Sequence, residues 1–170
     1  MNRHHANHRS GVTLIELLIY IAMAAILLGA IATLESTILQ ARQHMQAQVA
    51  VEEQGMIAMN TITGLVRNSA ATVTPANATP SATLSLTMPA PAALPSIVDV
   101  SANVLRLSEN GAAAQNLTAG KVSTVSLTVK NLTQPSAPSV LQVSFTLQAA
   151  WGHGQLYTQT FTSSTVRRTP

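Results

Sequence analysis

Cysteine is absent from the 170-residue sequence. Without thiols, the chain forms neither a disulfide framework nor a thiolate metal site. Charged residues make up 9% of the chain and aromatic residues 3%, so a globular core must be aliphatic and its surface must consist mainly of Ser, Thr, Asn and Gln. This composition favours a domain outside the bacterial cytoplasm over a cytosolic enzyme.

Side chains suited to catalysis or metal binding are scarce after residue 69, where the acidic residues are Asp99 and Glu109 and the histidine is His153. A histidine between two glycines, with no carboxylate or nucleophile motif beside it, is expected to be a turn residue rather than a catalytic base. Two distant acids do not supply the clustered oxygens of a calcium site. The sequence therefore predicts no catalytic site, no metal site and no cofactor. Three histidines lie near the N-terminus, at His4, His5 and His8. They have no acidic or thiol companions, so we do not expect them to bind a metal.

An apolar run spans residues 11–34 and is interrupted by a single carboxylate, Glu16. Between Leu17 and Leu34 there is no charged residue and no proline. At about 1.5 Å per helical residue, the run matches the thickness of a bilayer core, so we predict a transmembrane helix. A carboxylate inside an apolar helix costs a few kcal/mol. We therefore expect Glu16 to meet a partner.

The heptapeptide GVTLIEL at residues 11–17, with a short basic leader before it and the apolar run after it, resembles the N-terminal signature of type IV pilins and type II secretion pseudopilins. The resemblance implies that a prepilin peptidase in the inner membrane cleaves between Gly11 and Val12 and methylates the new amine of Val12. Glu16 then becomes the fifth residue of the mature chain. The usual first residue of the mature family is phenylalanine, from which Val12 departs. The implied partners are the peptidase, other pilin or pseudopilin subunits, and the inner membrane.

The carboxylate of Glu16 has a physical role in this interpretation. Cleavage creates a cation at Val12, one helical turn from Glu16 in the same chain and within reach of Glu16 in a staggered neighbour. A paired amine and carboxylate are less costly to bury than either group alone. We therefore predict that Glu16 sets the register of assembly. The alternative is that Glu16 lies at the headgroup level of an ordinary signal anchor.

The basic residues before the run, Arg3 and Arg9, favour a cytoplasmic N-terminus. The sequence thus predicts a single-pass protein of the bacterial inner membrane, with the head in the periplasm or outside the cell and the protein in a filament after assembly. An ordinary secretory signal peptide is the rival interpretation, because small residues near Ala30 and Ala32 loosely fit a cleavage site. That interpretation predicts a periplasmic β domain without an anchor.

Helical periodicity continues over residues 35–68 and predicts one helix from Thr13 to Asn68. Three methionines at helical spacing are expected in the core, and His44 is expected on a solvated face. Gly55 and Gly64 are consistent with bends, with close packing or with chance. The stripe expected to be buried contains Leu34, Ile38, Ala41, Met45, Val49, Met56, Met59, Ile62 and Val66.

The remaining segments suggest a β-rich head. Residues 69–96 contain five prolines and are predicted to be a Pro/Ala/Thr-rich loop region with one short strand near Thr83–Met88. Residues 97–170 alternate between apolar and polar side chains, which predicts half-buried antiparallel strands. The fold class is therefore α+β, with a leader at 1–11, a transmembrane or filament-core helix at 12–34, an amphipathic continuation at 35–68 packed on the head, the loop region, and the head at 97–170.

The sequence also narrows the choice among pilin classes. Many major type IV pilins close a C-terminal loop with a disulfide, which this chain cannot form. Residues 67–69, the proline-rich middle and the closing strand near 166–168 resemble J-type minor pseudopilins and W-type minor pilins. We therefore expect a minor structural subunit of a type IV pilus or type II secretion pseudopilus, not an enzyme.

An adhesin or DNA-uptake receptor on the same scaffold is a different function class. Removing a leader that contains Arg3 and Arg9 leaves seven basic against six acidic side chains, a net charge of +1. Nucleic acid is therefore not an expected partner on global charge. Binding to it would require five cations of the head to converge on one face: Arg106, Lys121, Lys130, Arg167 and Arg168.

Overall fold

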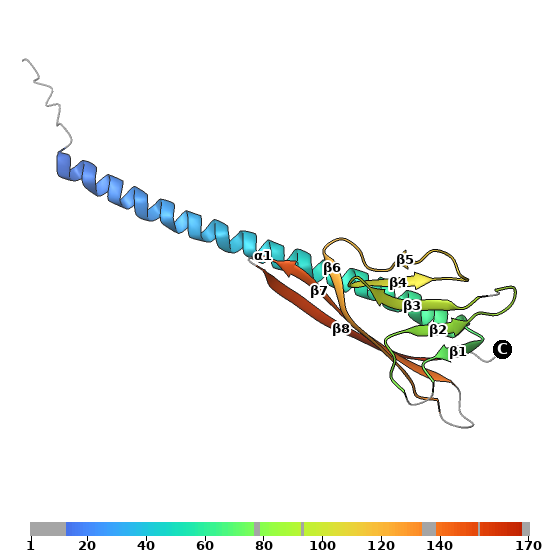
Figure 1. Ribbon diagram of the computed structural model, residues 1–170. Helices are drawn as coiled ribbons and strands as arrows, with labels where there is room; N and C mark the ends of the chain where they lie inside the picture. The colour runs from blue at the N-terminus through green and yellow to red at the C-terminus, as the bar shows by residue number, and fades with distance from the viewer. Residues whose placement is uncertain (1–12, 77–78, 93, 134–138, 153, 168–170) are drawn as a thin grey trace, which may run out of the picture. The chain divides into compact units, whose positions relative to one another are not determined.

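The structure is a computed structural model that describes residues 13–76, 79–92, 94–133, 139–152 and 154–167. The chain divides into two compact units, Met1–Ala41 and Arg42–Pro170. Figure 1 shows the order of the elements: helix α1 is followed by eight strands arranged in antiparallel sheets. The predicted α+β fold class is confirmed, as is the long N-terminal helix.

Helix α1 spans Leu14–Asn68, and its first part belongs to the first unit. Thr13 caps it: the Thr13 hydroxyl accepts a hydrogen bond from the backbone N–H of Glu16 at 3.4 Å. Every side chain from 14 to 41 is exposed, including Leu14 at 78% and Leu28 at 67%. By length and composition, α1 contains a stretch that is able to cross a membrane. So many exposed apolar side chains require cover from lipid or protein.

In the second unit, α1 packs on the sheets through a stripe of small and β-branched residues. Its buried residues recur at intervals of three and four, as expected for one helical face. The predicted stripe is only partly correct, because Ile62 and Val66 are buried whereas Met45, Val49 and Met56 are more than half exposed. The sheets lie against the neighbouring stripe instead, where short side chains allow a close approach. That stripe contains Ala47, Val51, Gly55, Ala58, Ile62, Leu65 and Val66.

Five strands form the first sheet, in the order β1-β2-β3-β4-β5. Their bounds are β1 Ala71–Thr74, β2 Leu84–Thr87, β3 Ser96–Ser101, β4 Val104–Ser108 and β5 Gln115–Asn116. The segment 69–96 therefore contributes β1 in addition to the expected strand, which is β2. Strand β1 has only four residues, all exposed or half-buried, so its short alternation of apolar and polar residues was not a sufficient signal for a strand.

Three long strands form the second sheet in the order β6-β7-β8, with bounds β6 Val122–Asn131, β7 Val140–Trp151 and β8 Gln155–Val166. The predicted alternation in β7 is confirmed, because Leu141, Val143, Phe145 and Leu147 are buried and the residues between them are half-buried. In β6 the predicted alternation of buried apolar and exposed polar residues fails at Val125. The pairing of β6 with β7 shifts between Thr124 and Ser126, and this bulge turns Val125 outward to 55% exposure.

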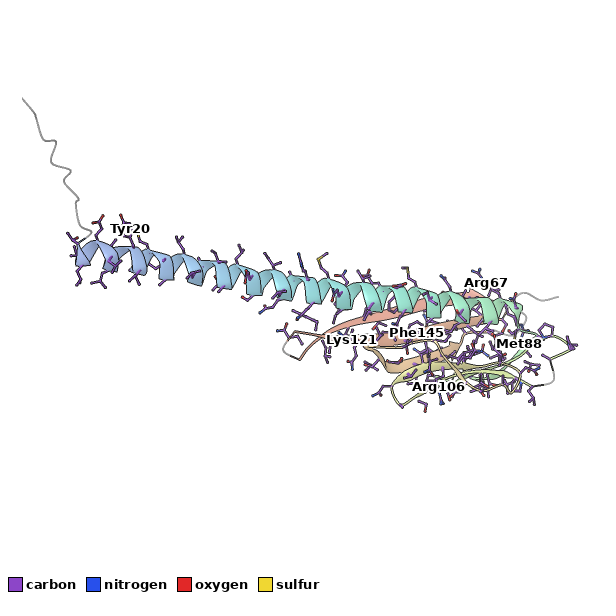
Figure 2. All side chains as sticks on the ribbon, turned by 90° about the horizontal axis from the view of Figure 1, so that it is seen from above. Tyr20, Arg67, Met88, Arg106, Lys121 and Phe145 are labelled. Carbon is purple, nitrogen blue, oxygen red and sulfur yellow. The ribbon has the colours of Figure 1, made fainter. Side chains whose placement is uncertain are left out.

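The core of the second unit joins α1 to both sheets. Its largest fully buried side chains include Phe145, Ile62 and Leu84, which come from β7, α1 and β2. Phe145 also stacks on Phe161 of β8 with a centroid distance of 5.5 Å. Figure 2 shows the strands gathered along one side of the second-unit part of α1, with Phe145 labelled near that side. One aliphatic core therefore stabilises helix and sheets together.

Candidate functional site

Glu16 lies in the first turn of α1, where backbone N–H groups and the helix dipole favour a carboxylate. The hydroxyl of Tyr20 donates a hydrogen bond to Glu16 Oε1 at 3.3 Å. This contact was not anticipated, although the spacing of four residues is a recognisable signal. This hydrogen bond orients the carboxylate but supplies no opposite charge to it. The predicted cleavage position, Gly11 and Val12, lies outside the described residues.

Arg106 of β4 forms an ion pair with a carboxylate of the neighbouring strand. Asp99 of β3 is its direct cross-strand partner. The guanidinium donates from Nε to Asp99 Oδ1 at 3.1 Å and from NH2 to Asp99 Oδ2 at 2.8 Å. These hydrogen bonds raise the pKa of Arg106 above its ordinary value. Arg106 is therefore not a free cation for a ligand.

Nucleic-acid binding would also require Lys121, Lys130 and Arg167, but these three residues do not converge on one face. Lys121 directly precedes β6, whereas Lys130 lies near the far end of the same strand. The alternation of β8 places Arg167 on the side of buried Thr165, whereas Lys130 is exposed opposite Gln142. Arg168 lies outside the described residues. Together with the Asp99 pairing of Arg106, this arrangement does not form a continuous basic face.

An aromatic cluster joins α1 to the β7–β8 hairpin within the second unit. The His44 ring lies edge-on to Trp151 at a centroid distance of 4.7 Å and to Tyr157 at 5.7 Å. The expectation that His44 lies on a solvated face is therefore wrong, because it is half-buried against these rings. Sequence reasoning missed the cluster because His44 is more than a hundred residues from Trp151 and Tyr157 in the chain.

The hydroxyl of Tyr157 completes this cluster with polar contacts. It lies 2.8 Å from Gln159 Oε1 and 3.5 Å from Glu52 Oε1, and it donates toward both. Burial, followed by the charge of Glu52, raises the pKa of Tyr157 above its ordinary value of 10.0. The Nε2 of Gln48 donates to Glu52 Oε1 at 3.0 Å. These contacts fix the position of the Tyr157 side chain next to His44.

A cleft of about 500 Å³ opens beside this cluster, between the second-unit part of α1 and the ends of β6 and β7. Among the described residues of its lining, Lys121 is the charged one and none is acidic. The other large side chains of the lining are Gln43, Gln46 and Trp151. Five small residues complete the wall: Ala47, Ala50, Ala149, Ala150 and Gly152.

Metal-ligating side chains do not cluster in the described part of the chain, which contains no group of three or more His, Cys, Asp or Glu suited to hold an ion. His153 lies outside that part. The described residues therefore provide an exposed apolar helix with a carboxylate, Glu16, in its first turn, and a polar, weakly charged head.

Comparison with protein families identifies a match at one end of the chain. Residues 6–32 match the family model of the prokaryotic N-terminal methylation motif, which is consistent with the signal of type IV pilins and pseudopilins. The N-terminal segment thus carries the signal of a type IV pilin-like or pseudopilin-like precursor. Together with the apolar helix, it is consistent with membrane anchoring. No curated protein and no solved structure matches the chain.

Proposed function

We propose that the chain is a structural subunit, a minor pilin or pseudopilin, of a type IV pilus or type II secretion pseudopilus. The observation that carries this proposal is the methylation motif at residues 6–32, which overlaps the start of a helix whose side chains are exposed from 14 to 41. Such a helix needs lipid before assembly and neighbouring helices after it. Proteins with this motif act as structural parts rather than as catalysts, and the proposed role is accordingly structural.

The proposed processing begins in the inner membrane with the N-terminus in the cytoplasm. Prepilin peptidase removes the leader 1–11 by cutting between Gly11 and Val12, and Val12 is then N-methylated. The head stands in the periplasm and later on the filament. The match to the methylation motif, which includes Gly11 and Val12, supports this step.

The proposed assembly step pairs Glu16 with the methylated amine of Val12 on an adjacent subunit. Two opposite charges buried together avoid most of the cost of burying one alone. The hydrogen bond from Tyr20 to Glu16 supports this role, because it limits the orientations of the carboxylate. Residues 12–34 form the filament-core segment of the proposal, and 35–68 carry the helix into the head.

The assignment to a minor class depends on two features of the sequence. The chain has no cysteine for the disulfide loop of many major pilins, and its middle and closing segments resemble J-type minor pseudopilins and W-type minor pilins. Nucleic-acid uptake is not proposed, because the cations that it requires are divided between faces and Arg106 is paired with Asp99.

The mature N-terminus tests the proposal. We expect mass spectrometry of the protein purified from its native cells to find N-methyl-Val12 as the first residue. A chain that starts near Thr33 would instead indicate an ordinary signal peptide, and a chain that still begins with Met1 would contradict processing altogether. Gly11→Val should leave the leader attached, whereas Ser10→Ala, a change at the neighbouring position, should be processed normally.

A further inference from the structure

The cleft beside Trp151 is large enough for a small ligand. Its volume of about 500 Å³ lies within the range of small-molecule sites. The space exists because alanine and glycine line the wall where larger residues would fill it. Ala47 and Ala50 come from α1, and Ala149 and Ala150 from β7. The site therefore depends on the packed head rather than on a local loop.

The polar groups of the cleft have unused hydrogen-bonding capacity. Among the described residues, the side chains of Gln43, Gln46 and Lys121 have neither a hydrogen bond nor an ion pair, and all three are exposed. The two amides each donate and accept, and the ammonium donates. With one cation and no acid in its lining, the cleft favours an anionic ligand that also carries hydroxyl groups.

The indole of Trp151 packs against a second ring within the head. His44 supports it edge-on at 4.7 Å, Tyr157 supports His44 at 5.7 Å, and Gln159 accepts a hydrogen bond from Tyr157 at 2.8 Å. A supported aromatic ring needs little reordering when a ligand binds, which lowers the entropic cost of binding. Its flat apolar face suits the C–H face of a pyranose ring, while the polar groups beside it suit the hydroxyls of the sugar.

We propose that this cleft binds an acidic sugar unit of a polysaccharide. The pyranose ring packs on Trp151, the carboxylate of the sugar pairs with Lys121, and its hydroxyls exchange hydrogen bonds with Gln43 and Gln46. This function goes beyond filament assembly, because it gives the head a ligand of its own. It does not require the N-terminal segment to be processed.

Fluorescence of the full chain tests the proposal, since Trp151 is its only tryptophan. The chain is held in micelles of a detergent without a sugar headgroup and titrated with trigalacturonate, with maltotriose as the neutral comparison. We expect a saturable change with trigalacturonate. We expect maltotriose to bind about tenfold more weakly, as is typical for the loss of one charge-assisted hydrogen bond.

Two lysine variants separate the site from general charge attraction. Lys121→Gln should weaken trigalacturonate binding about tenfold, whereas Lys130→Gln removes the same charge elsewhere on the head and should leave binding unchanged. An equal loss in both variants overturns the proposal. Equal affinity for the neutral and acidic sugars overturns it as well.

A cleft-filling variant that remains folded shows whether a loss of binding comes from the cleft itself rather than from misfolding. Ala150 is exposed, so Ala150→Leu should occupy the cleft while the unfolding midpoint stays unchanged, and trigalacturonate binding should be lost. Undiminished binding in this folded variant overturns the proposal. So does the absence of any saturable fluorescence change in the unaltered chain.

Discussion

The ring of Phe161 fills the space that a side chain on Gly55 would need. A Cβ added to Gly55 would overlap three carbon atoms of this ring. Phe161 is itself stacked on Phe145 in the core, so the ring has little freedom to move away. Of the three explanations open for Gly55, close packing is therefore the correct one. The sequence alone does not distinguish Gly64 from Gly55. A Cβ added to Gly64 would meet no atom within 4 Å.

Two alanine substitutions in the same helix should therefore have different effects. Each gains about 1 kcal/mol of helix propensity, but only Gly55→Ala introduces an overlap. We expect Gly55→Ala to leave the second unit about 1–3 kcal/mol less stable than Gly64→Ala does, as measured by denaturant unfolding of the full chain in micelles. With Phe161→Ala in the background, the difference should disappear. Equal effects without that background would contradict the close packing.

Strand β8 is the last strand of its sheet, and the pairing geometry shows which of its backbone groups point outward. The N–H of Arg167 donates to the carbonyl of Ser139 at 2.9 Å, and the register pairs these strands without interruption. Hydrogen-bonded pairs alternate along antiparallel strands. The residues turned toward β7 are therefore Gln159, Phe161 and Ser163, and those turned toward the open edge are Thr158, Thr160, Thr162 and Ser164.

Hydrogen exchange should alternate along β8 in the same way. We expect the amides of the residues turned toward the open edge to exchange faster than those turned toward β7, because their N–H groups lack a partner strand. Residue-resolved exchange on the unassembled protein measures this. Strand β7, which is paired on both sides, provides the control and should be protected at both sets of positions. Uniform protection along β8 would contradict an open edge.

The pair of Asp99 and Arg106 should contribute little to stability despite its two hydrogen bonds. Both side chains are about a third exposed, at 37% and 32%, and pairs of this kind contribute less than about 1 kcal/mol. We expect Arg106→Gln to cost no more than this, with the loss shrinking as salt is added. Lys130→Gln serves as the unpaired control and should have no effect. A larger, salt-independent loss would show that the pair is a structural requirement.

Alkaline pH should destabilise the second unit through Tyr157. Its pKa in the folded chain is raised above 10.0, so the folded state holds the phenolic proton more tightly than the unfolded state. The resulting stability is fully present below pH 10 and is lost as pH rises through the folded pKa. In a Tyr20→Phe background, the absorbance of tyrosinate should show a midpoint above pH 10. Tyr157→Phe should reduce the alkaline loss of stability, and a midpoint below pH 10 would refute the shift.

Glu16→Val separates processing from assembly. We expect the peptidase still to remove the leader, because the change lies beyond the cleavage position, whereas incorporation into filaments should fail because the pairing partner of the Val12 amine is gone. Mass spectrometry of the mature chain and immunoblotting of sheared filaments measure the two steps. Normal incorporation of the variant would count against the pairing role.

Local patterns allowed much of the fold to be predicted from the sequence. The alternation from Leu141 to Leu147 and the helical period ending at Asn68 each depend on neighbouring residues, and both predictions are confirmed. The buried face of the helix was harder to predict. Met45 and Ala47 belong to competing stripes, and the choice between them depends on which one the distant sheets can approach closely.

Local sequence patterns could not predict the cleft in the head either, because it also depends on contacts between residues that are distant in the sequence. Trp151 and His44 are far apart in sequence, and neither residue signals the other. The bulge at Val125 likewise depends on pairing with β7. At the N-terminus the situation is reversed, because the motif that includes Glu16 is a short linear signal that can be read without any structure.

Strands β6, β7 and β8 contain a single charged residue, Lys130, and no histidine, aspartate or glutamate. Nothing in these strands changes protonation between mild acid and neutrality, and there is almost nothing for dissolved ions to screen. Their pairing should thus be indifferent to the acidity and salinity of the medium, so that this sheet would keep the same shape when either one changes.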